Sequence, residues 1–236
     1  YSKIGYNVLG VSVNDFFYGI DPLINIKNKG NISIVSSDIL NKEDKKTIFP
    51  DTIIKDFGKI KIGITGTSGF SIEKPYLHKD VLDKIEISDS ITSANQAISK
   101  LRNEKASILV LITGLEATLN SKGELSSELA TFIDKLTIKP NVLITLNGQY
   151  GFSTSYKGVN VIAPGNYGNS IGTSKFIVNA VTEKVEKVSI SNIYTYADDF
   201  KQDESIINKF NDATKTYEAE LNKVIGKSNN GLTISS

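Results

Sequence analysis

Few side chains in this 236-residue sequence are of the types that catalytic or metal sites use. Cysteine is absent and His78 is the only histidine, which excludes disulfides, thiolate metal sites and any site that needs two imidazoles. A single histidine in a loop-like stretch is most often a solvated surface residue. Asp198, Asp199, Asp203 and Glu204 cluster where a helix is expected to begin, and the helix dipole explains carboxylates there. A weak surface cation site is the alternative interpretation of that cluster.

A glycine-rich stretch from Gly63 to Gly69 invites a phosphate-loop interpretation. Phosphate loops end in Gly-Lys-Ser/Thr, because the lysine reaches the phosphates and the hydroxyl reaches magnesium. This stretch ends in Thr67-Ser68-Gly69 and lacks that lysine. We therefore expect only a turn from a strand into a loop.

The composition indicates a globular chain with no broad electrostatic preference for a partner. Lys and Arg number 27 against 26 Asp and Glu, a formal charge of +1, so nothing favours nucleic acid or an anionic membrane. Apolar residues make up 39% and charged residues 22%, which is typical of a folded domain. No apolar run approaches the roughly 20 residues that a membrane-spanning helix needs. Arg102 is the only arginine, and the bias toward Lys, Asn and Ile indicates a low-GC bacterial source.

Strand-like and helix-like patterns alternate along the chain. Short runs rich in Val and Ile predict strands, and apolar residues three or four positions apart predict amphipathic helices. The alternation predicts a layered α/β domain over residues 1–226, followed by a flexible tail over 227–236. The expected strands are 31–36, 52–57, 59–65, 107–112, 141–146, 159–163, 175–181 and 186–193, and the expected helices are 90–102, 124–136 and 204–224.

An ordered set of residues frames the chain: Gly5, Tyr6, Phe16, Tyr18, Gly19 and Asp21, with further segments at 35–39, 49–50, 58–66 and 163–172. In this order and spacing the set resembles the N-terminal metallophosphoesterase domain of bacterial 5′-nucleotidases. The resemblance implies a layered sheet sandwich with flanking helices. It also implies two divalent metals that activate water and clamp a phosphate.

The first family motif that falls within the chain lacks the residues that bind metal and donate a proton. The resemblance places the Asn-His-Glu motif, which supplies a metal ligand and a catalytic histidine, on Val13, Asn14 and Asp15. Val13 has no atom that can coordinate a metal. Asn14 cannot donate a proton as an imidazolium does near neutral pH. We expect no catalysis from this motif.

The other metal motifs that the resemblance implies are altered in the same way. A metal-binding histidine becomes Gly114, and the two histidines of a Gly-Gly-His-Thr-His segment become Asn147 and Gln149. Two earlier motifs would lie before Tyr1, so the amino-terminal strands that carry them are expected to be missing or the sheet completed in another way. The expectation is a chain with no metal, no cofactor and no catalytic residues.

We therefore expect a non-catalytic, 5′-nucleotidase-like pseudoenzyme whose scaffold serves binding. It is expected to be an exported or surface protein of a bacterium, without a membrane span, and a lipoprotein if an anchor precedes Tyr1. The partner would be an unknown protein or a host ligand rather than nucleic acid. One alternative is a metal-dependent nucleotide phosphoesterase completed by an upstream segment or a partner chain. Another is a structural subunit or antigenic coat protein with no ligand.

Three regions are expected to provide contact surfaces. The first is an uncharged polar groove near Asn14, Thr113 and Asn147, where the family has its catalytic cleft. The other two are exposed loops over 67–84 and 149–157, because loops carry binding residues on a rigid scaffold. The second loop contains the aromatic residues Tyr150, Phe152 and Tyr156.

Overall fold

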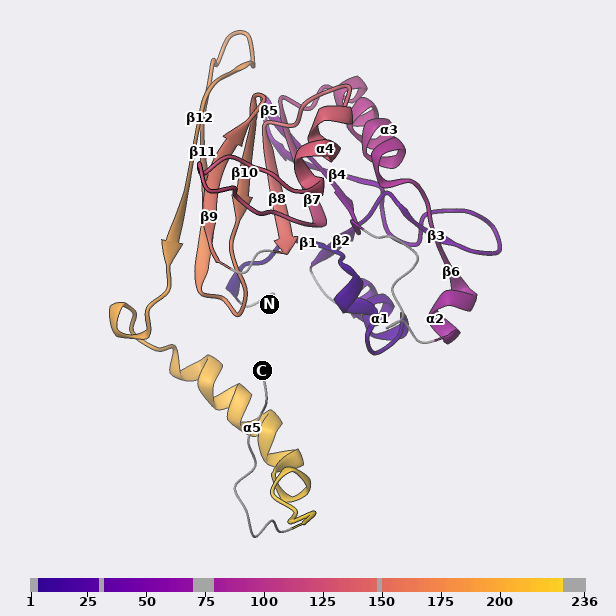
Figure 1. Ribbon diagram of the computed structural model, residues 1–236, viewed down its shortest axis with the longest axis vertical. Coiled ribbons are helices and arrows are strands. Elements are labelled where there is room, and N and C mark those ends of the chain that lie inside the picture. Colours follow the sequence, from indigo (N-terminus) through magenta and orange to yellow (C-terminus); the bar gives the residue numbers. More distant parts are fainter. Residues whose placement is uncertain (1–3, 30–31, 70–78, 148–149, 227–236) are drawn as a thin grey trace. The chain divides into compact units, whose positions relative to one another are not determined.

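The computed structural model describes residues 4–29, 32–69, 79–147 and 150–226 (Figure 1). The chain divides into two compact units, Tyr1–Thr195 and Tyr196–Ser236. Among the described residues, no helix is long and apolar enough to cross a membrane. The domain boundary expected at residue 226 stays a prediction.

A six-stranded sheet lies at the centre of the first unit, formed by β4 (Thr52–Phe57), β5 (Ile60–Thr67), β7 (Ile108–Glu116), β8 (Val142–Asn147), β9 (Phe152–Tyr156) and β10 (Val159–Ala163). The strand order is β4-β5-β7-β8-β10-β9. The four inner strands are parallel, and the edge strands β4 and β9 pair antiparallel with their neighbours. The inner strands are nearly continuous apolar runs because both faces of a parallel sheet are covered.

Two helices, α3 (Ser90–Asn103) and α4 (Glu128–Lys135), cover one face of this sheet. Asp89 caps α3, since its carboxylate accepts a hydrogen bond of 2.8 Å from the backbone N–H of Thr92. Each large apolar side chain buried here stabilises the fold by roughly 1.5–3 kcal/mol. This core includes Ile98, Leu101, Leu109, Leu111, Leu129, Phe132, Ile133, Leu143, Val159 and Val161.

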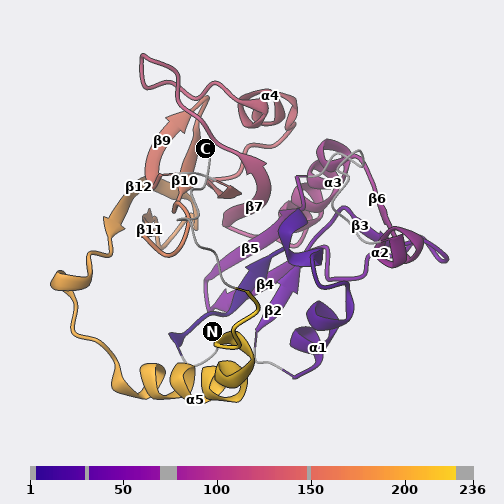
Figure 2. The ribbon, with the colours of Figure 1, turned by 60° about the horizontal axis from the view of Figure 1, so that its bottom comes forward.

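Two small sheets lie on the opposite face of the central sheet. One pairs β1 (Val8–Gly10) with β2 (Ser33–Val35) in parallel, and the other pairs β11 (Ser170–Val178) with β12 (Val185–Tyr194) as a hairpin. A methyl group at Gly10 would lie 2.5 Å from Ile112, so only glycine lets β1 approach β7 so closely. Figures 1 and 2 show α3 and α4 on one side of the central sheet and the hairpin on the other. The predicted layered α/β fold is confirmed.

A second apolar cluster lies beside β2 and β5. It is built around the fully buried rings of Phe16 and Phe49. The elements that surround it are the 3₁₀ helix η2 (Val13–Phe16), α1 (Asp21–Lys29), β3 (Ile39–Asn41), α2 (Lys79–Lys84) and β6 (Ile85–Ile87).

The second unit contains a short 3₁₀ helix, η3 (Ala197–Asp199), and the helix α5 (Glu204–Leu221). Asp203 caps α5, because its carboxylate accepts hydrogen bonds from the N–H groups of Ser205 and Ile206 at 2.9 and 3.3 Å. The helix was predicted to reach Val224 and ends three residues earlier, with Asn222 at its C-cap.

Three other predicted elements are wrong in part. The helix predicted from Glu124 begins at Glu128, because Leu125 pairs with Leu119 in an isolated bridge instead. The loop predicted over 149–157 contains the edge strand β9. The strand predicted over 175–181 runs from Ser170 to Val178 and then turns.

Candidate functional site

The carboxyl ends of β5, β7 and β8 are where the resemblance places a metal site. Parallel strands bring their ends to one edge of a sheet, and ligands of open α/β sheets bind there. The nearby turn after β1 carries η2, so Val13, Asn14 and Asp15 lie in that short helix. The carboxylate of Asp15 accepts hydrogen bonds from the N–H and hydroxyl of Ser12 at 2.7 and 3.1 Å. Its contacts in the fold are therefore those of a residue that fixes the start of η2.

Gly114 lies in β7 with no room for a side chain. A methyl group at this position would lie 1.9 Å from the carbonyl oxygen of Ser68 and 3.4 Å from the Cβ of Ser12. Gly69 faces it, since a methyl group there would lie 2.3 Å from the N of Leu115. The segments of Ser12 and Gly114 thus meet, as the resemblance implies, but backbone fills the space between the ends of β5 and β7.

A row of threonines crosses the three strand ends. Thr67 pairs with Thr113 and Thr113 with Thr145 in the register of the sheet, and all three are buried. The hydroxyl of Thr67 donates to that of Thr113 at 3.0 Å, and the hydroxyl of Thr145 donates to the carbonyl of Leu115. Thr113 therefore does not line the groove expected near Asn14, Thr113 and Asn147, because its side chain is buried and hydrogen-bonded inside the fold.

Asp38 is a buried carboxylate that the sequence did not single out. It has no exposed surface and accepts four hydrogen bonds, from the hydroxyls of Ser36, Ser68 and Ser90 at 2.8, 2.8 and 2.7 Å and from the N–H of Ser68 at 2.9 Å. Ser36 directly follows β2, Ser68 directly follows β5, and Ser90 begins α3. Asp38 therefore ties three elements together directly beneath the Ser68–Gly114 contact.

A cavity of about 340 Å³ opens beside this network, between the starts of α3 and α4. Its floor includes Leu115 and Phe132, and its polar lining includes Ser88, Asp89 and Glu128. The hydrogen bonds from the side chain and then the backbone of Thr92 lower the pKa of Asp89. Asp89 and Glu128 are the only acidic groups among its lining residues.

Among the described residues, the remaining predicted site residues do not form a metal or catalytic site. His78 and Gln149 lie outside the described residues, and only the backbone of Asn147, at the end of β8, is described. Asp203 acts as a helix cap, which confirms the structural interpretation of the acidic cluster. Within residues 4–29, 32–69, 79–147 and 150–226, no three His, Asp or Glu side chains are grouped so that they could hold a metal ion.

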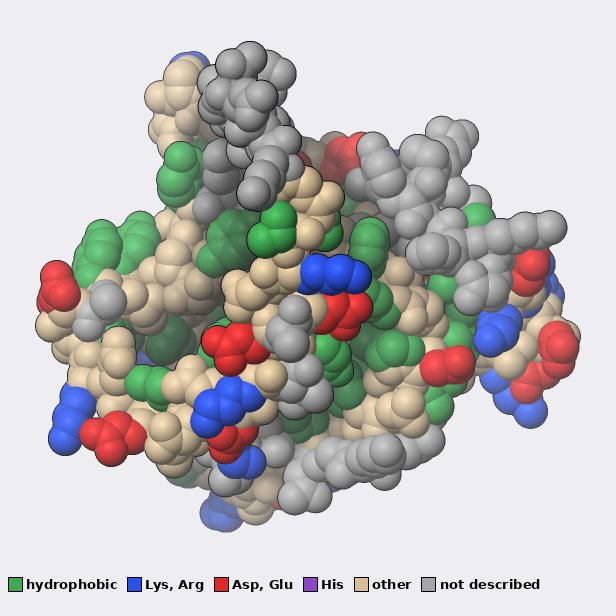
Figure 3. Space-filling model, turned by 90° about the horizontal axis from the view of Figure 1, so that it is seen from below, with side chains coloured by type: hydrophobic (Ala, Val, Ile, Leu, Met, Phe, Trp, Pro, Cys, Tyr) green, Lys and Arg blue, Asp and Glu red, His purple; other side chains and the backbone are tan. Residues whose placement is uncertain are grey.

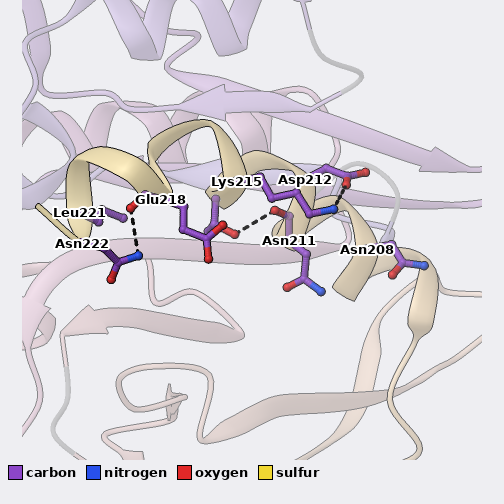
Figure 4. A pocket seen from close by; sticks show the side chains of 8 residues that line it. Asn208, Asn211, Asp212, Lys215, Glu218, Leu221 and Asn222 are labelled. Carbon is purple, nitrogen blue, oxygen red and sulfur yellow. Dashed lines mark hydrogen bonds and ion pairs between the residues drawn. The ribbon is translucent and has the colours of Figure 1, made fainter.

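A larger cavity, of about 620 Å³, lies along α5 and is lined by residues of that helix and its C-cap, Asn222 (Figure 4). Its charged groups include Lys215 and Asp212, which form an ion pair of 3.5 Å one helical turn apart. Such exposed pairs contribute little to stability. Lys, Arg, Asp and Glu side chains are mingled on the face shown in Figure 3, and its described residues form no broad patch of one charge.

No family model matches the sequence, and no curated protein matches it either. Solved structures do match its fold. The calcineurin-like phosphoesterase YfkN from Bacillus subtilis superposes with a TM-score of 0.73 over 94% of this chain, at 15% identity. A 5′-nucleotidase precursor from Thermus thermophilus gives 0.69 over 95%, also at 15% identity.

This chain has the calcineurin-like phosphoesterase fold. The sulfate thiohydrolase SoxB from Thermus thermophilus shares that fold with a TM-score of 0.71 over 92% of this chain, at 13% identity. The chain spans 38% of the length of SoxB, 46% of the nucleotidase precursor and 73% of YfkN. The fold that the sequence resemblance implied is confirmed.

Proposed function

We propose that this chain is a non-catalytic protein that uses a phosphoesterase fold as a binding scaffold. One observation carries the proposal: the contact of Ser68 with Gly114 occupies the place of a side chain at the end of β7. A metal site at this edge would need a ligand side chain from that strand, as the family resemblance implies. No such side chain fits unless the backbone after β5 moves.

The charges at the same edge also support the proposal. Transfer or hydrolysis of a phosphoryl group needs cations that stabilise the negative charge developing on its oxygens. The described segments at the strand ends, 11–20, 67–69, 113–118 and 164–169, contain no Lys, Arg or His. They contain the carboxylates of Asp15 and Glu116, which would repel a phosphate.

We also propose that the protein acts outside the cytoplasm of a bacterium, at the cell surface or beyond it. Three observations support this: the absence of cysteine, the excess of Lys, Asn and Ile that is typical of low-GC bacteria, and the fold shared with a protein described as a 5′-nucleotidase precursor. Separation of a tagged culture into cytoplasmic, membrane and medium fractions tests this. Recovery in the cytoplasmic fraction alone would contradict it.

Calorimetric titration with Mn²⁺ and Zn²⁺, together with a phosphatase assay on nucleotide mono-, di- and triphosphates, tests the loss of catalysis. We expect no stoichiometric metal binding and no turnover above a buffer blank. The 5′-nucleotidase from Thermus thermophilus, assayed beside it, controls for the metal and substrate conditions.

Tight stoichiometric metal binding with turnover would overturn the proposal. It would favour instead a metal-dependent nucleotide phosphoesterase completed by a further segment or a partner chain. Repeating the assay on Asp15→Asn and Glu116→Gln would then locate the metal, since these residues provide the exposed carboxylates at the strand ends.

A further inference from the structure

Three exposed tyrosines lie on segments that contact one another at one corner of the first unit, in the region after β8 and β10. Tyr150 is 72% exposed, Tyr167 is 105% exposed and Tyr194 is 47% exposed. They come from the segment before β9, the loop between β10 and β11, and the end of β12. We call these three residues, with Asn166 and Asn169, the aromatic corner.

Short contacts hold the three segments of the aromatic corner together. A methyl group at Gly165 would lie 2.7 Å from the N of Gly151 and 3.1 Å from the carbonyl carbon of Tyr150. The hydroxyl of Tyr194 donates to the carbonyl of Gly151 at 2.9 Å. The loop that carries Tyr167 is therefore packed directly against the segment that carries Tyr150.

Uncharged side chains fix the base of the corner. The side chain of Asn192 donates to the carbonyl of Ala163 and to the hydroxyl of Ser170 at 2.9 and 3.0 Å, and it accepts a hydrogen bond from Ser153. Thr195 also holds the loop between β10 and β11, because its N–H donates to the carbonyl of Asn169 at 3.0 Å. The rings are thus presented on a fixed backbone, which lowers the entropy that a ligand would have to overcome.

Tyr167 contributes little to the fold that carries it. Its ring is fully exposed, so its burial adds nothing to the core, and its backbone has a φ of 58°. This left-handed conformation favours glycine or asparagine and costs a residue with a large side chain roughly 1 kcal/mol or more. The exposed ring adds no burial that would offset this cost.

The segments that build the corner contain no charged residue. Residues 150–156, 158–174 and 188–195 lack Asp, Glu, Lys, Arg and His, in a chain of which 22% is charged. A nucleotide or another anion would need Lys or Arg beside the rings, and an organic cation is usually held by carboxylates as well. The lack of both charges in these three segments favours a neutral ligand.

The corner is also small. A stable protein interface covers about 800 Å² on each partner, from 20–30 residues. The apolar pair Ile171 and Ile193 does not extend the corner, because side chains alternate along a strand and this pair faces away from Ser170 and Tyr194. A ring-sized ligand fits three tyrosines and two amides better than a protein surface does.

We propose that the aromatic corner binds a neutral saccharide. A sugar ring has an apolar C–H face that stacks on an aromatic ring, and hydroxyls at its rim that both donate and accept hydrogen bonds. The amides of Asn166 and Asn169 are exposed and also do both. The inference rests on the proposed binding function and names the ligand class that the scaffold takes.

Calorimetry with maltohexaose, cellohexaose, tri-N-acetylchitotriose and lactose tests the proposal on the full chain, with tyrosine fluorescence as a second readout, since the chain has no tryptophan. We expect saturable binding of at least one of them.

Tyr167→Ala and Tyr150→Ala should each weaken saccharide binding about three- to tenfold, the effect of losing one stacked ring. Tyr167→Trp should keep it. Phe57→Ala, which removes a ring that is 69% exposed at the end of β4, is the matched control and should change nothing.

Two outcomes would overturn the saccharide inference. One is that no member of the panel binds the wild-type chain. The other is that Tyr167→Ala and Tyr150→Ala bind as tightly as Phe57→Ala does. Either result leaves the metal and phosphatase measurements untouched, so the failure of this inference and the failure of the non-catalytic proposal are distinguishable. Binding of a protein that depends on Tyr167, without saccharide binding, would assign the corner to a protein partner instead.

Discussion

The carboxyl ends of β5 and β7 and the aromatic corner beyond β8 and β10 are two regions of one sheet with opposite properties. We call the first region the closed centre. There Ser68 and Gly69 lie in close contact with the segment of Gly114, and the polar side chains of Thr113 and Asp38 are buried and hydrogen-bonded inside the fold. At the second, Tyr150 and Tyr167 point their rings into solvent from a fixed backbone.

The difference shows how to separate polar groups that serve the fold from groups that are left for a ligand. In the closed centre the buried side chains of Asp38, Thr67 and Thr113 are hydrogen-bonded within the protein, so their removal should change stability. In the aromatic corner the rings of Tyr150 and Tyr167 are mostly exposed, so their removal should change binding and leave stability nearly unaltered. Substitutions in the two regions test this contrast.

Gly114→His should have the largest effect, because its Cβ would lie 1.9 Å from the carbonyl oxygen of Ser68. We expect a loss of more than about 3 kcal/mol in the free energy of unfolding, measured by urea denaturation, or no folded protein. Thr118→His places the same imidazole on an exposed loop and should be nearly neutral. A stable Gly114→His variant that binds Zn²⁺ would mean that the centre opens easily.

Asp38→Ala should be the next most damaging change. It leaves the hydroxyls of Ser36, Ser68 and Ser90 without their acceptor in a buried site, so we expect a loss of about 2–4 kcal/mol in the same measurement. Asp83→Ala, at an exposed carboxylate on α2, serves as its control. Equal stability of the two variants would show that water replaces the carboxylate and that the network does not hold the centre closed.

The hydroxyl pair of Thr67 and Thr113 allows a double-mutant cycle. Each single change to valine removes the hydrogen bond between the two buried hydroxyls and should cost about 1–2 kcal/mol, although the hydroxyl of Thr113 in Thr67→Val still accepts from the N–H of Leu115 at 3.3 Å. The double variant replaces both partners with groups of similar shape and should cost less than the sum of the two. Additive losses would mean that the hydrogen bond of 3.0 Å contributes no coupling.

Asp89 forms the outer wall of the closed centre, next to Ser90. Loss of its cap in Asp89→Ala should cost about 1 kcal/mol at pH 7. Its pKa is lowered in the fold by the hydrogen bonds from Thr92, so the contribution is present above about pH 4 and is lost as pH falls through the folded pKa. Denaturation curves of the variant and the wild type should therefore converge at low pH, and a gap that stays constant down to pH 2 would contradict this.

Tyr167→Ala should have the smallest effect on stability, within about 0.5 kcal/mol, although it weakens saccharide binding. The ring is fully exposed, so no burial is lost. A differential scanning comparison with Phe57→Ala measures this directly. A loss above 1 kcal/mol would mean that the ring stabilises its loop, and the contrast between the two regions would then fail.

Local patterns in the sequence predicted the parts of the fold that depend on neighbouring residues. The Val/Ile runs at 107–112 and 141–146 form β7 and β8, and Asp89 caps the predicted helix. The three-residue strands β1, β3 and β6 were not predicted, because their pairing partners set them rather than their own composition. The strand β9 was taken for a loop for the same reason: its pairing with β10 overrides a run of Ser, Thr and aromatic residues.

The sequence also showed which site residues the family pattern lacks, but not what replaced them. Asp38 meets Ser68 and Ser90 across 30 and 52 residues of chain, and no spacing rule connects them. The approach of Ser68 to Gly114 is likewise a contact between two strands. The run Ser36-Ser37-Asp38 after a buried strand is the one signal in the sequence that could have indicated a polar network there.

The interlock of two glycines, Gly69 and Gly114, has a consequence for the mutational paths open to this protein. Any side chain at 114 collides with the backbone after β5, and any at 69 collides with the backbone of β7. A metal-binding side chain at position 114 therefore requires the backbone of β7 and the backbone after β5 to move together. A variant with only one of the required substitutions would be destabilised. Substitutions around the closed centre can therefore accumulate, whereas the first substitution that would reopen a metal site there destabilises the fold and is selected against.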